Sequence, residues 1–249
     1  MRLWRKRIPG IESLRPVASF DFSAIFSSPS SDEEWPTVAA RIDAITQIED
    51  GRTDGVNPGD RRALYYFTRW LKPTSVLEIG THVGASTLYI AAALKHQQSP
   101  KLTTVDIEDV NAADGPWSKA GLARSPGEGL AELGVSVNFV RAHSIIFFDR
   151  TPEKFDFIFL DGDHSQKTVS SEIPRALNHL NENGVILLHD YFPNGNALWK
   201  EEAPIGGPYM AVQKLQRDGA NIAAVPLGTL PWPTKRGTNV TSLAALLAL

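Results

Sequence analysis

The chain has 249 residues, of which 42% are hydrophobic and 21% are charged, and its formal net charge is −3. A chain of this length can bury a sizeable core, and it fits one large domain with an extension better than two equal domains. It contains no cysteine, which excludes a disulfide framework, a thiolate metal site and a cysteine nucleophile. The acidic balance disfavours nucleic-acid binding, because proteins that follow a phosphate backbone usually carry a basic excess.

Residues 1–50 are predicted to form an N-terminal extension, a candidate for a lid or for the contact of a homo-oligomer. Four prolines and a serine-rich run predict that residues 1–37 are irregular, and Ser31 with the acids after it is expected to cap a helix that continues to residue 48. No apolar run reaches the roughly 18–20 residues of a membrane span. A secretory signal requires an apolar run after the basic N-terminus, and this sequence has none there. We therefore expect no membrane partner and a cytoplasmic location.

From residue 51 onward, apolar runs typical of strands alternate with segments of helical spacing. The predicted helices are 60–71, 85–96, 127–133, 166–180 and 208–218, and the predicted strands are 75–79, 102–106, 136–141, 155–161, 184–189 and 220–227. Pro174 is expected to break the helix at 166–180, and residues 238–249 to give a last strand or a short helix. The alternation predicts a parallel sheet with helices on both faces, which binds ligands at the carboxyl ends of its strands.

The turn after the first predicted strand contains Gly80 and Gly84, which allow the backbone to bend and to approach a ligand closely. It lacks the Gly-x-Gly-x-x-Gly spacing of a dinucleotide site, and Glu78 ahead of it repels a diphosphate but suits a cationic ligand. Asp106 ends the second strand, where a carboxylate can accept hydrogen bonds from both hydroxyls of a ribose. Together these residues predict a site for a nucleoside that carries a positive charge.

The stretch from Val76 to Thr87, together with Asp106, resembles the first motif and the ribose-binding acid of the class I S-adenosylmethionine-dependent methyltransferases. The resemblance implies a methyltransferase domain over residues 51–249 with an α/β, doubly wound, Rossmann-like sheet. This sheet is expected to be mostly parallel, with seven strands and one antiparallel strand near the C-terminus. The cofactor implied is S-adenosylmethionine, and the residues expected around it are Glu78, Gly80, Thr81, Gly84, Ser86, Thr87, Asp106, His143 and Ser144.

The second half is similar to small-molecule O-methyltransferases of the family 24 type, whose relatives include sugar, natural-product and catechol enzymes. The similarity rests on residues 159–165 and 183–191. Metal-dependent members bind a divalent cation through acids after the fourth and fifth strands, so the resemblance implies Asp161, His189 and Asp190 as ligands of Mg²⁺ or Mn²⁺. An imidazole ligand such as His189 favours Mn²⁺, Fe²⁺, Ni²⁺ or Zn²⁺ over Mg²⁺. Tyr191 stands where the catechol type has an amide.

His164 is the candidate general base, because it follows a strand end closely and a free imidazole titrates near neutral pH. Asp161 is assigned to catalysis beside it, since a bound cation lowers the pKa of an acceptor hydroxyl and orients it. The predicted reaction is methyl transfer to a hydroxyl oxygen of a small molecule, a sugar or a natural product. Candidates for the acceptor pocket are the aromatic residues Trp117, Tyr191, Phe192, Trp199, Tyr209 and Trp232.

Several alternatives stay open at this point. The same fold supports N-methylation or carboxyl methylation without a metal. A nicotinamide-dependent dehydrogenase is disfavoured by the glycine spacing and by Glu78, and a non-catalytic binding protein by the intact first motif. For His164 and for the pair His189 and Asp190, structural hydrogen bonding is the alternative to catalysis or metal binding.

Overall fold

The structure is a computed structural model that describes residues 8–17, 20–46, 55–200 and 203–249. Within these residues one sheet of seven strands has the order β3-β2-β1-β4-β5-β7-β6. Its strands are β1 (Ser75–Ile79), β2 (Lys101–Asp106), β3 (Val137–Arg141), β4 (Phe155–Leu160), β5 (Leu180–Leu188), β6 (Ile222–Pro226) and β7 (Ala244–Ala248). β7 is antiparallel to both of its neighbours, and the remaining pairs are parallel. The predicted Rossmann-like sheet with one antiparallel strand near the C-terminus is therefore confirmed.

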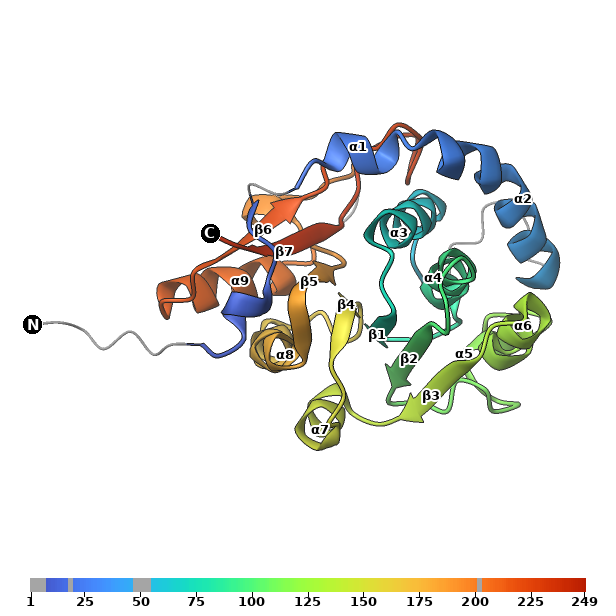
Figure 1. Ribbon diagram of the computed structural model, residues 1–249, viewed down its shortest axis with the longest axis horizontal. Helices are drawn as coiled ribbons and strands as arrows, with labels where there is room; N and C mark the ends of the chain where they lie inside the picture. The colour runs from blue at the N-terminus through green and yellow to red at the C-terminus, as the bar shows by residue number, and fades with distance from the viewer. Residues whose placement is uncertain (1–7, 18–19, 47–54, 201–202) are drawn as a thin grey trace, which may run out of the picture.

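Helices cover both faces of this sheet (Figure 1). They are α1 (Phe22–Phe26), α2 (Pro29–Thr46), α3 (Pro58–Leu71), α4 (Ala85–Leu94), α5 (Pro116–Lys119), α6 (Pro126–Leu133), α7 (Ser144–Arg150), α8 (Gln166–Asn178) and α9 (Gly207–Arg217). Side chains alternate along each strand between two core layers. Val76 packs into the layer with α3, α4 and α6, whereas its neighbour Leu77 packs into the layer with α7, α8 and α9. Both layers are apolar, which explains why the strands read as continuous hydrophobic runs.

Much of the described part of the segment predicted to be irregular is helical, so this part of the prediction is wrong. Asp21 caps α1 through its side chain, and α2 begins at Pro29, a first-turn position where proline costs no hydrogen bond. Pro36 lies inside α2, yet the helix continues because Ile42 and Ile45 are buried in the core. Figure 1 shows α1 and α2 arching over α3 and α4. The part of the predicted extension at residues 47–50 lies outside the described residues.

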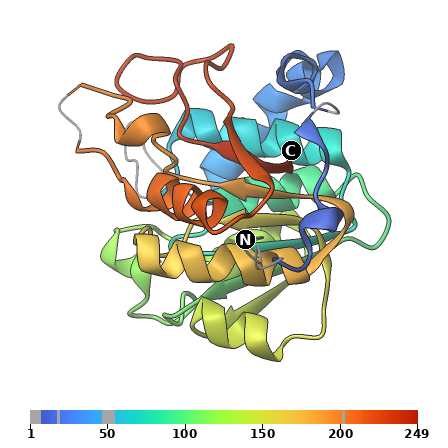
Figure 2. The same cartoon turned by 90° about the vertical axis from the view of Figure 1, so that its left-hand side faces the viewer.

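The prediction that Pro174 breaks its helix is also wrong. α8 runs without interruption from Gln166 to Asn178 and contains Pro174. Proline leaves the carbonyl of Ser170 without its usual helical donor, but Ile173 and Ala176 on either side are fully buried. Burial of this apolar face outweighs the lost hydrogen bond. The view in Figure 2 shows α8 and α9 packed side by side over the sheet.

The C-terminal residues settle the expectation of a last strand or a short helix. The tail forms a strand, β7, inserted between β5 and β6.

The loop after β2 contains the short helix α5, which the sequence did not predict, and a proline at its first position begins it. Among the described residues, no helix combines the length and the apolar character needed to cross a membrane.

Candidate active site

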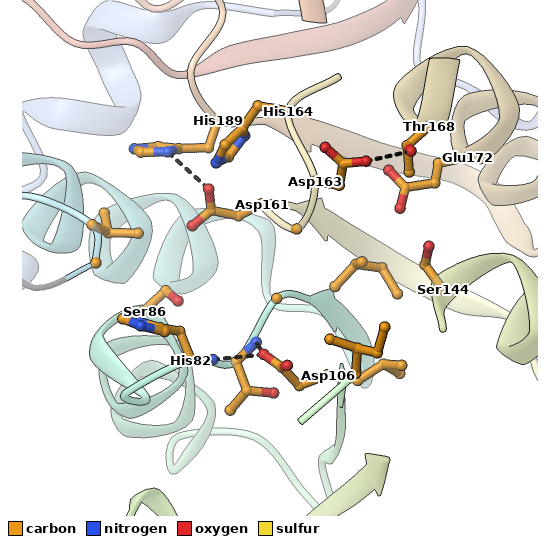
Figure 3. A pocket seen from close by; sticks show the side chains of 18 of the residues that line it. His82, Ser86, Asp106, Ser144, Asp161, Asp163, His164, Thr168, Glu172 and His189 are labelled. Carbon is orange, nitrogen blue, oxygen red and sulfur yellow. Dashed lines mark hydrogen bonds and ion pairs between the residues drawn. The ribbon is translucent and has the colours of Figure 1, made fainter. Parts of the chain in front are cut away.

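A cavity of about 560 Å³ opens at the carboxyl ends of the parallel strands, where the sequence analysis expected a ligand. Its wall comes from five strand ends, from α8 and from the residues before α3. Figure 3 shows the two sides of this cavity, with Asp106 and Ser86 facing Asp161 and His189 across it. The predicted site residues that line it are Gly80, Thr81, Ser86, Asp106, His143, Ser144, Asp161, His164, His189 and Asp190. Glu78, Gly84 and Thr87 do not line it.

The loop after β1 is shaped by its two glycines. Gly80 has a φ of 95° and Gly84 a φ of 77°, both in the left-handed region that favours glycine. A Cβ at Gly80 would collide with the backbone carbonyl of Asp161, and one at Gly84 would meet the ring of Pro126. The amide of Asp161 donates to the carbonyl of Ile79 at 2.9 Å. The glycine loop is thus held against the end of β4, which brings the β1 and β4 sides of the cavity together.

Glu78 lies beneath the loop and is fully buried. Its carboxylate accepts hydrogen bonds from Ser86 Oγ and Thr87 Oγ1 at 2.5 Å and from Thr104 Oγ1 at 2.6 Å. Burial raises the pKa of Glu78 to about 7, although the three hydroxyls act in the opposite direction. In this structure Glu78 therefore ties the start of α4 to β2, and it does not reach the cavity from this position.

The side chain of Asp106 lies in the cavity wall at the end of β2 and binds backbone amides of the glycine loop. Its Oδ2 accepts hydrogen bonds from the amides of Thr81 and His82 at 3.0 and 2.9 Å, and its Oδ1 accepts one from the amide of Glu108 at 2.9 Å. Each carboxylate oxygen has two lone pairs, so these contacts leave acceptor capacity. Figure 3 shows the carboxylate at the cavity wall beside His82.

Three side chains converge at the ends of β4 and β5. Asp161, His164 and Asp190 each offer a ligand atom, and these atoms all lie within 4.8 Å of one another. His164 Nε2 is 3.4 Å from Asp190 Oδ2. Two carboxylates and one imidazole, partly exposed at a cavity, fit the donor set of a small divalent cation, in which carboxylate oxygens suit Mg²⁺ and the imidazole suits Mn²⁺.

Asp190 adopts a left-handed backbone conformation with a φ of 49°, which is uncommon outside glycine. The segment before β7 holds it there, because Tyr191 donates its amide to the carbonyl of Ser242 at 2.9 Å and Ser242 Oγ lies 3.3 Å from Asp190 Oδ1. Burial acts to raise the pKa of Asp190, but the charge and hydrogen bond of His189, with weaker help from His164, lower it to about 2. Asp190 is therefore an anion under ordinary conditions.

His189 lines the cavity at the end of β5, as expected, and its ring lies between two carboxylates. Its Nδ1 is 2.9 Å from Asp161 Oδ1, and its Nε2 is 3.3 Å from Asp60 Oδ2. Burial acts to lower the pKa of His189, but Asp161 and Asp190 outweigh it and raise that pKa well above the ordinary value. A protonated imidazole has no free lone pair for a cation. His189 therefore fits the description of a buried cation between carboxylates better than that of a metal ligand.

The third part of the wall lies at the end of β3 and on α8. His143 Nδ1 accepts a hydrogen bond from the amide of Ile145 and so caps α7. Asp163 accepts hydrogen bonds from Ser165 and Thr168 at the start of α8, and burial raises the pKa of Glu172, one turn further along, to about 7. Figure 3 shows Glu172 and Ser144 facing each other across this end of the cavity.

Two acidic residues, one in the cavity wall and one behind it, were not predicted as site residues. Asp60 appeared in the sequence only as the start of a helix, and Glu172 lies within a helix where no strand-end rule selects it. Conversely, none of the six aromatic candidates for an acceptor pocket lines the described cavity wall. Four of them are buried in the protein: Tyr191, Phe192, Trp199 and Trp232.

Comparison with known proteins adds to this geometry. A family model described as a methyltransferase domain matches residues 77–191. The matched segment runs from the strand before the glycine loop to the residue after Asp190, and so contains every strand end that lines the cavity. Residues 77–191 of the chain therefore match a methyltransferase domain. The resemblance to the class I S-adenosylmethionine-dependent methyltransferases is confirmed.

Solved structures support the same fold for this methyltransferase domain. A methyltransferase of Podospora anserina bound to SAH is 17% identical, with a TM-score of 0.54 over 89% of this chain and 88% of that one. An O-methyltransferase of Bacillus cereus in complex with SAH is 15% identical, with a TM-score of 0.55 over 89% and 91%. The O-methyltransferase TomG of Streptomyces achromogenes, involved in tomaymycin synthesis and solved with SAM, is 16% identical, with a TM-score of 0.56 over 89% and 90%. Comparison with curated proteins gives no match.

Proposed function

We propose that this protein transfers the methyl group of S-adenosylmethionine to a hydroxyl oxygen of a small molecule. The observation that carries the proposal is that one cavity joins a carboxylate suited to a ribose, Asp106, to a cluster suited to activating a hydroxyl, Asp161, His164 and Asp190. O-methyltransferases among the similar structures favour oxygen as the acceptor atom. In keeping with the strand-end rule, both ligands would meet above the end of β4.

The cofactor would occupy the side of the cavity formed by the glycine loop. Asp106 keeps one free lone pair, on Oδ1, for a ribose hydroxyl, and the backbone of Gly80 and Thr81 leaves room for close approach. The sulfonium of S-adenosylmethionine is positive, and carboxylates on the facing wall favour a positive charge between them. When bound, this cofactor supplies an electrophilic methyl group.

His164 would remove the proton of the acceptor hydroxyl. Its ring is about one-third exposed and lines the cavity, and Asp190 lies 3.4 Å from its Nε2. The charge of Asp190 stabilises the imidazolium that forms when the proton arrives. His164 would also hold the acceptor by a hydrogen bond before transfer, which places the hydroxyl at the mouth of the β4 and β5 loops.

Asp161 and Asp190 would hold a divalent cation, with His164 beside it. Such a cation, when bound, lowers the pKa of an acceptor hydroxyl and orients it. The two carboxylates line the cavity, and their ligand atoms are close enough to share one ion. The remaining positions around the ion would be open to the oxygens of an acceptor and to water.

A second candidate, methyl transfer without a metal, is favoured by one specific observation. Both carboxylates already face an imidazole, since His189 Nδ1 is 2.9 Å from Asp161 and His164 Nε2 is 3.4 Å from Asp190. In this version the histidines balance the charge that a cation would otherwise balance. N-methylation and carboxyl methylation belong to this candidate, because a neutral amine or a carboxylate needs no metal to become a nucleophile.

The proposal is tested first by calorimetric titration with S-adenosylhomocysteine. The wild-type protein is expected to bind it, and Asp106→Ala is expected to bind at least tenfold more weakly, because hydrogen bonds to a charged group contribute about 1.5–3 kcal/mol each. Asp114→Ala removes an exposed acid that does not line the cavity and should leave the affinity unchanged. Absence of binding by the wild-type protein would reject the proposed function.

The metal is tested separately by titration of the wild-type protein with MnCl₂, monitored by the loss of the free Mn²⁺ electron-paramagnetic signal. The metal-dependent version predicts binding that Asp161→Asn and Asp190→Asn both abolish. If the wild-type protein binds S-adenosylhomocysteine but not Mn²⁺ or Mg²⁺, the metal-free candidate is the correct one.

We further propose that the protein acts in the cytoplasm on a small molecule rather than on nucleic acid.

A further inference from the structure

Asp60 is a buried acid that does not belong to the cavity wall. It lies in the first turn of α3 and is completely buried. Its backbone amide donates to Asn57 Oδ1 at 3.0 Å, while Asn57 Nδ2 donates to Asp60 Oδ2 at 2.8 Å. Its other carboxylate oxygen, Oδ1, is buried and has no hydrogen-bond partner among the described residues. A buried carboxylate is costly unless it is paired, so its retention at this position needs a reason.

Asp60 forms an ion pair with His189, across the gap between α3 and the end of β5. The contacts of the His189 ring are ion-pair contacts, because neither ring nitrogen has a hydrogen-bond partner among the described residues. Asp60 Oδ2 lies 3.3 Å from His189 Nε2, and on the other side of the ring His189 Nδ1 lies 2.9 Å from Asp161 Oδ1. His189 is 8% exposed and lines the cavity together with Asp161. Three side chains from three separate elements therefore form one row, which begins in the protein interior and ends at the cavity wall. Figure 3 shows the cavity end of this row, where His189 points at Asp161.

The start of α3 is a rigid base for this row. The indole Nε1 of Trp232 donates to the carbonyl of Gly59 at 2.9 Å in the buried interior. A Cβ at Gly59 would come within 2.5 Å of the carbonyl of Pro233, so the first turn of α3 is pressed against the segment that follows β6. Asn57 then fixes the side chain of Asp60 itself. The carboxylate has little freedom to move away from His189.

From this geometry we infer that Asp60 is a positioning residue of the methyltransferase site: it fixes the ring of His189, and the ring in turn fixes the carboxylate of Asp161. The inference rests on the proposed function, in which Asp161 works at the reaction centre. The same logic applies where a second carboxylate orients a histidine that contacts a metal or a reacting group, as in carboxylate–histidine pairs at enzyme centres. Asp60 itself does not line the cavity in which the cofactor and the acceptor would bind.

A role confined to helix capping gives a different expectation. An acid in the first turn of a helix stabilises it through the helix dipole, and Asn57 already caps α3. If capping were its only role, replacement of Asp60 would destabilise the protein without any effect on Asp161. Coupling between Asp60 and Asp161, which do not contact each other, is therefore the quantity that separates the two roles.

The first test is a double-mutant cycle on unfolding free energy, with Asp60→Asn, Asp161→Asn and the double variant. We expect the two effects to be non-additive beyond experimental error. The coupling should vanish when the cycle is repeated in the background of His189→Phe, which removes the connecting ring. Asp32→Asn is the matched control. Asp32 lies on α2 and forms an ion pair at 3.2 Å with Arg62, which is on α3 like Asp60, but among the described residues no hydrogen bond or ion pair joins Asp32 to Asp60, His189 or Asp161. A cycle of Asp32→Asn with Asp161→Asn should be additive. Additive effects of Asp60 and Asp161 would overturn the inference.

The second test reads the ring of His189 directly by NMR of protein labelled with ¹⁵N-histidine. In the wild-type protein we expect both ring N–H groups of His189 to be protected from exchange with solvent. Asp60→Asn retains an acceptor oxygen and should alter the Nε2 signal and, through the ring, the Nδ1 signal that faces Asp161. Asp60→Ala should enlarge both changes, and Asp32→Asn should cause neither. An Nδ1 signal that is unchanged in Asp60→Ala would overturn the inference.

Titration with S-adenosylhomocysteine keeps this result separate from the proposed function. Since Asp60 does not line the cavity, Asp60→Asn is expected to bind S-adenosylhomocysteine within twofold of the wild-type protein. If the wild-type protein fails to bind it, the proposed function fails, whereas the coupling and the NMR signals still decide whether Asp60 positions Asp161. If only Asp60→Asn loses binding while it remains folded and uncoupled from Asp161, the positioning role is rejected.

Discussion

At the scale of single residues, Gly80 lies directly after the first strand and close against the backbone that follows the fourth strand. Its left-handed backbone and the nearby carbonyl of Asp161 both exclude a side chain. The two halves of the cavity, one suited to a cofactor and one to an acceptor, meet at this contact. A small change at Gly80 is therefore expected to affect stability and binding together.

We predict that Gly80→Ala lowers the free energy of unfolding by about 3 kcal/mol or more, because the new Cβ adds steric overlap to backbone strain. Gly134→Ala is the matched control. Gly134 has a φ of 73°, but a Cβ there meets no atom within 4 Å, so only backbone strain of about 1–2 kcal/mol is expected. Urea unfolding of both variants measures the difference. Equal losses would show that the contact with Asp161 does not matter.

Glu78 gives a pH-dependent prediction. Burial raises the pKa of this carboxyl in the folded protein to about 7, from about 4.5 in the unfolded chain. Between these two values the folded state holds a proton that the unfolded state has released, so this group makes stability fall as pH rises from about 4.5 to 7. Each unit of pKa shift corresponds to about 1.4 kcal/mol.

In Glu78→Gln the fall in stability between pH 5 and pH 7 should be smaller than in the wild-type protein, whatever the absolute stability of the variant. Unfolding curves at several pH values measure this slope. Glu33→Gln, on the exposed side of α2, is the control and should keep the wild-type slope. A wild-type slope in Glu78→Gln would contradict the raised pKa.

The sequence predicted which residues surround the cavity better than it predicted what each one contacts. The strand-end rule selected Asp106, Asp161 and His164 because parallel strands bring their carboxyl ends to one edge. It could not distinguish the surroundings of His164 from those of His189, since the surroundings of His189 include Asp60, a residue that is distant in the sequence. Nor could it tell that Glu78 lies below the loop, because the direction of a side chain at a strand end depends on packing from both faces.

At the scale of elements, helix α8 shows how tertiary packing overrides local preference. Proline in a helix interior is about 3 kcal/mol less favourable than alanine, yet α8 passes through Pro174 without a break. Its buried residues Ile173 and Leu177 anchor it in the core layer that α8 shares with α9 over the sheet. The same reasoning explains α2, which contains Pro36. Prolines were the main source of error in the predicted elements, because their local effect is visible in a sequence and the compensating burial is not.

We predict that Pro174→Ala stabilises the protein by about 1–2 kcal/mol. The variant restores an amide donor for the carbonyl of Ser170, and greater freedom of the unfolded chain offsets part of the gain. Thermal unfolding measures the change. Pro29→Ala is the control, because Pro29 occupies the first position of α2, where no amide is needed, and it should bring no gain. A loss of stability in Pro174→Ala would show that the proline ring itself contributes to packing.

At the scale of the whole molecule, ligand binding and folding stability are linked. A ligand that binds only the folded state, present at 100 times its Kd, adds about 2.7 kcal/mol to the free energy of unfolding. For a protein of this size, we expect S-adenosylhomocysteine to raise the Tm by roughly 5–10 °C under that condition. Scanning calorimetry measures the shift, and Asp106→Ala should show a clearly smaller one at the same concentration. A Tm unaffected by the ligand would contradict the proposed cofactor site.

The position of β7 has a consequence for how the molecule is made. β7 follows β6 in the chain but lies between β5 and β6, and Ser242 just before it contacts Asp190. During synthesis the apolar edge of β5 therefore stays uncovered until the residues of β7 have left the ribosome, and uncovered strand edges promote aggregation. The same event completes the surroundings of Asp190. A nascent chain that stalls before Ser242 would expose the unpaired edge of β5, which is prone to aggregation, and would at the same time lack the contact of Ser242 with Asp190.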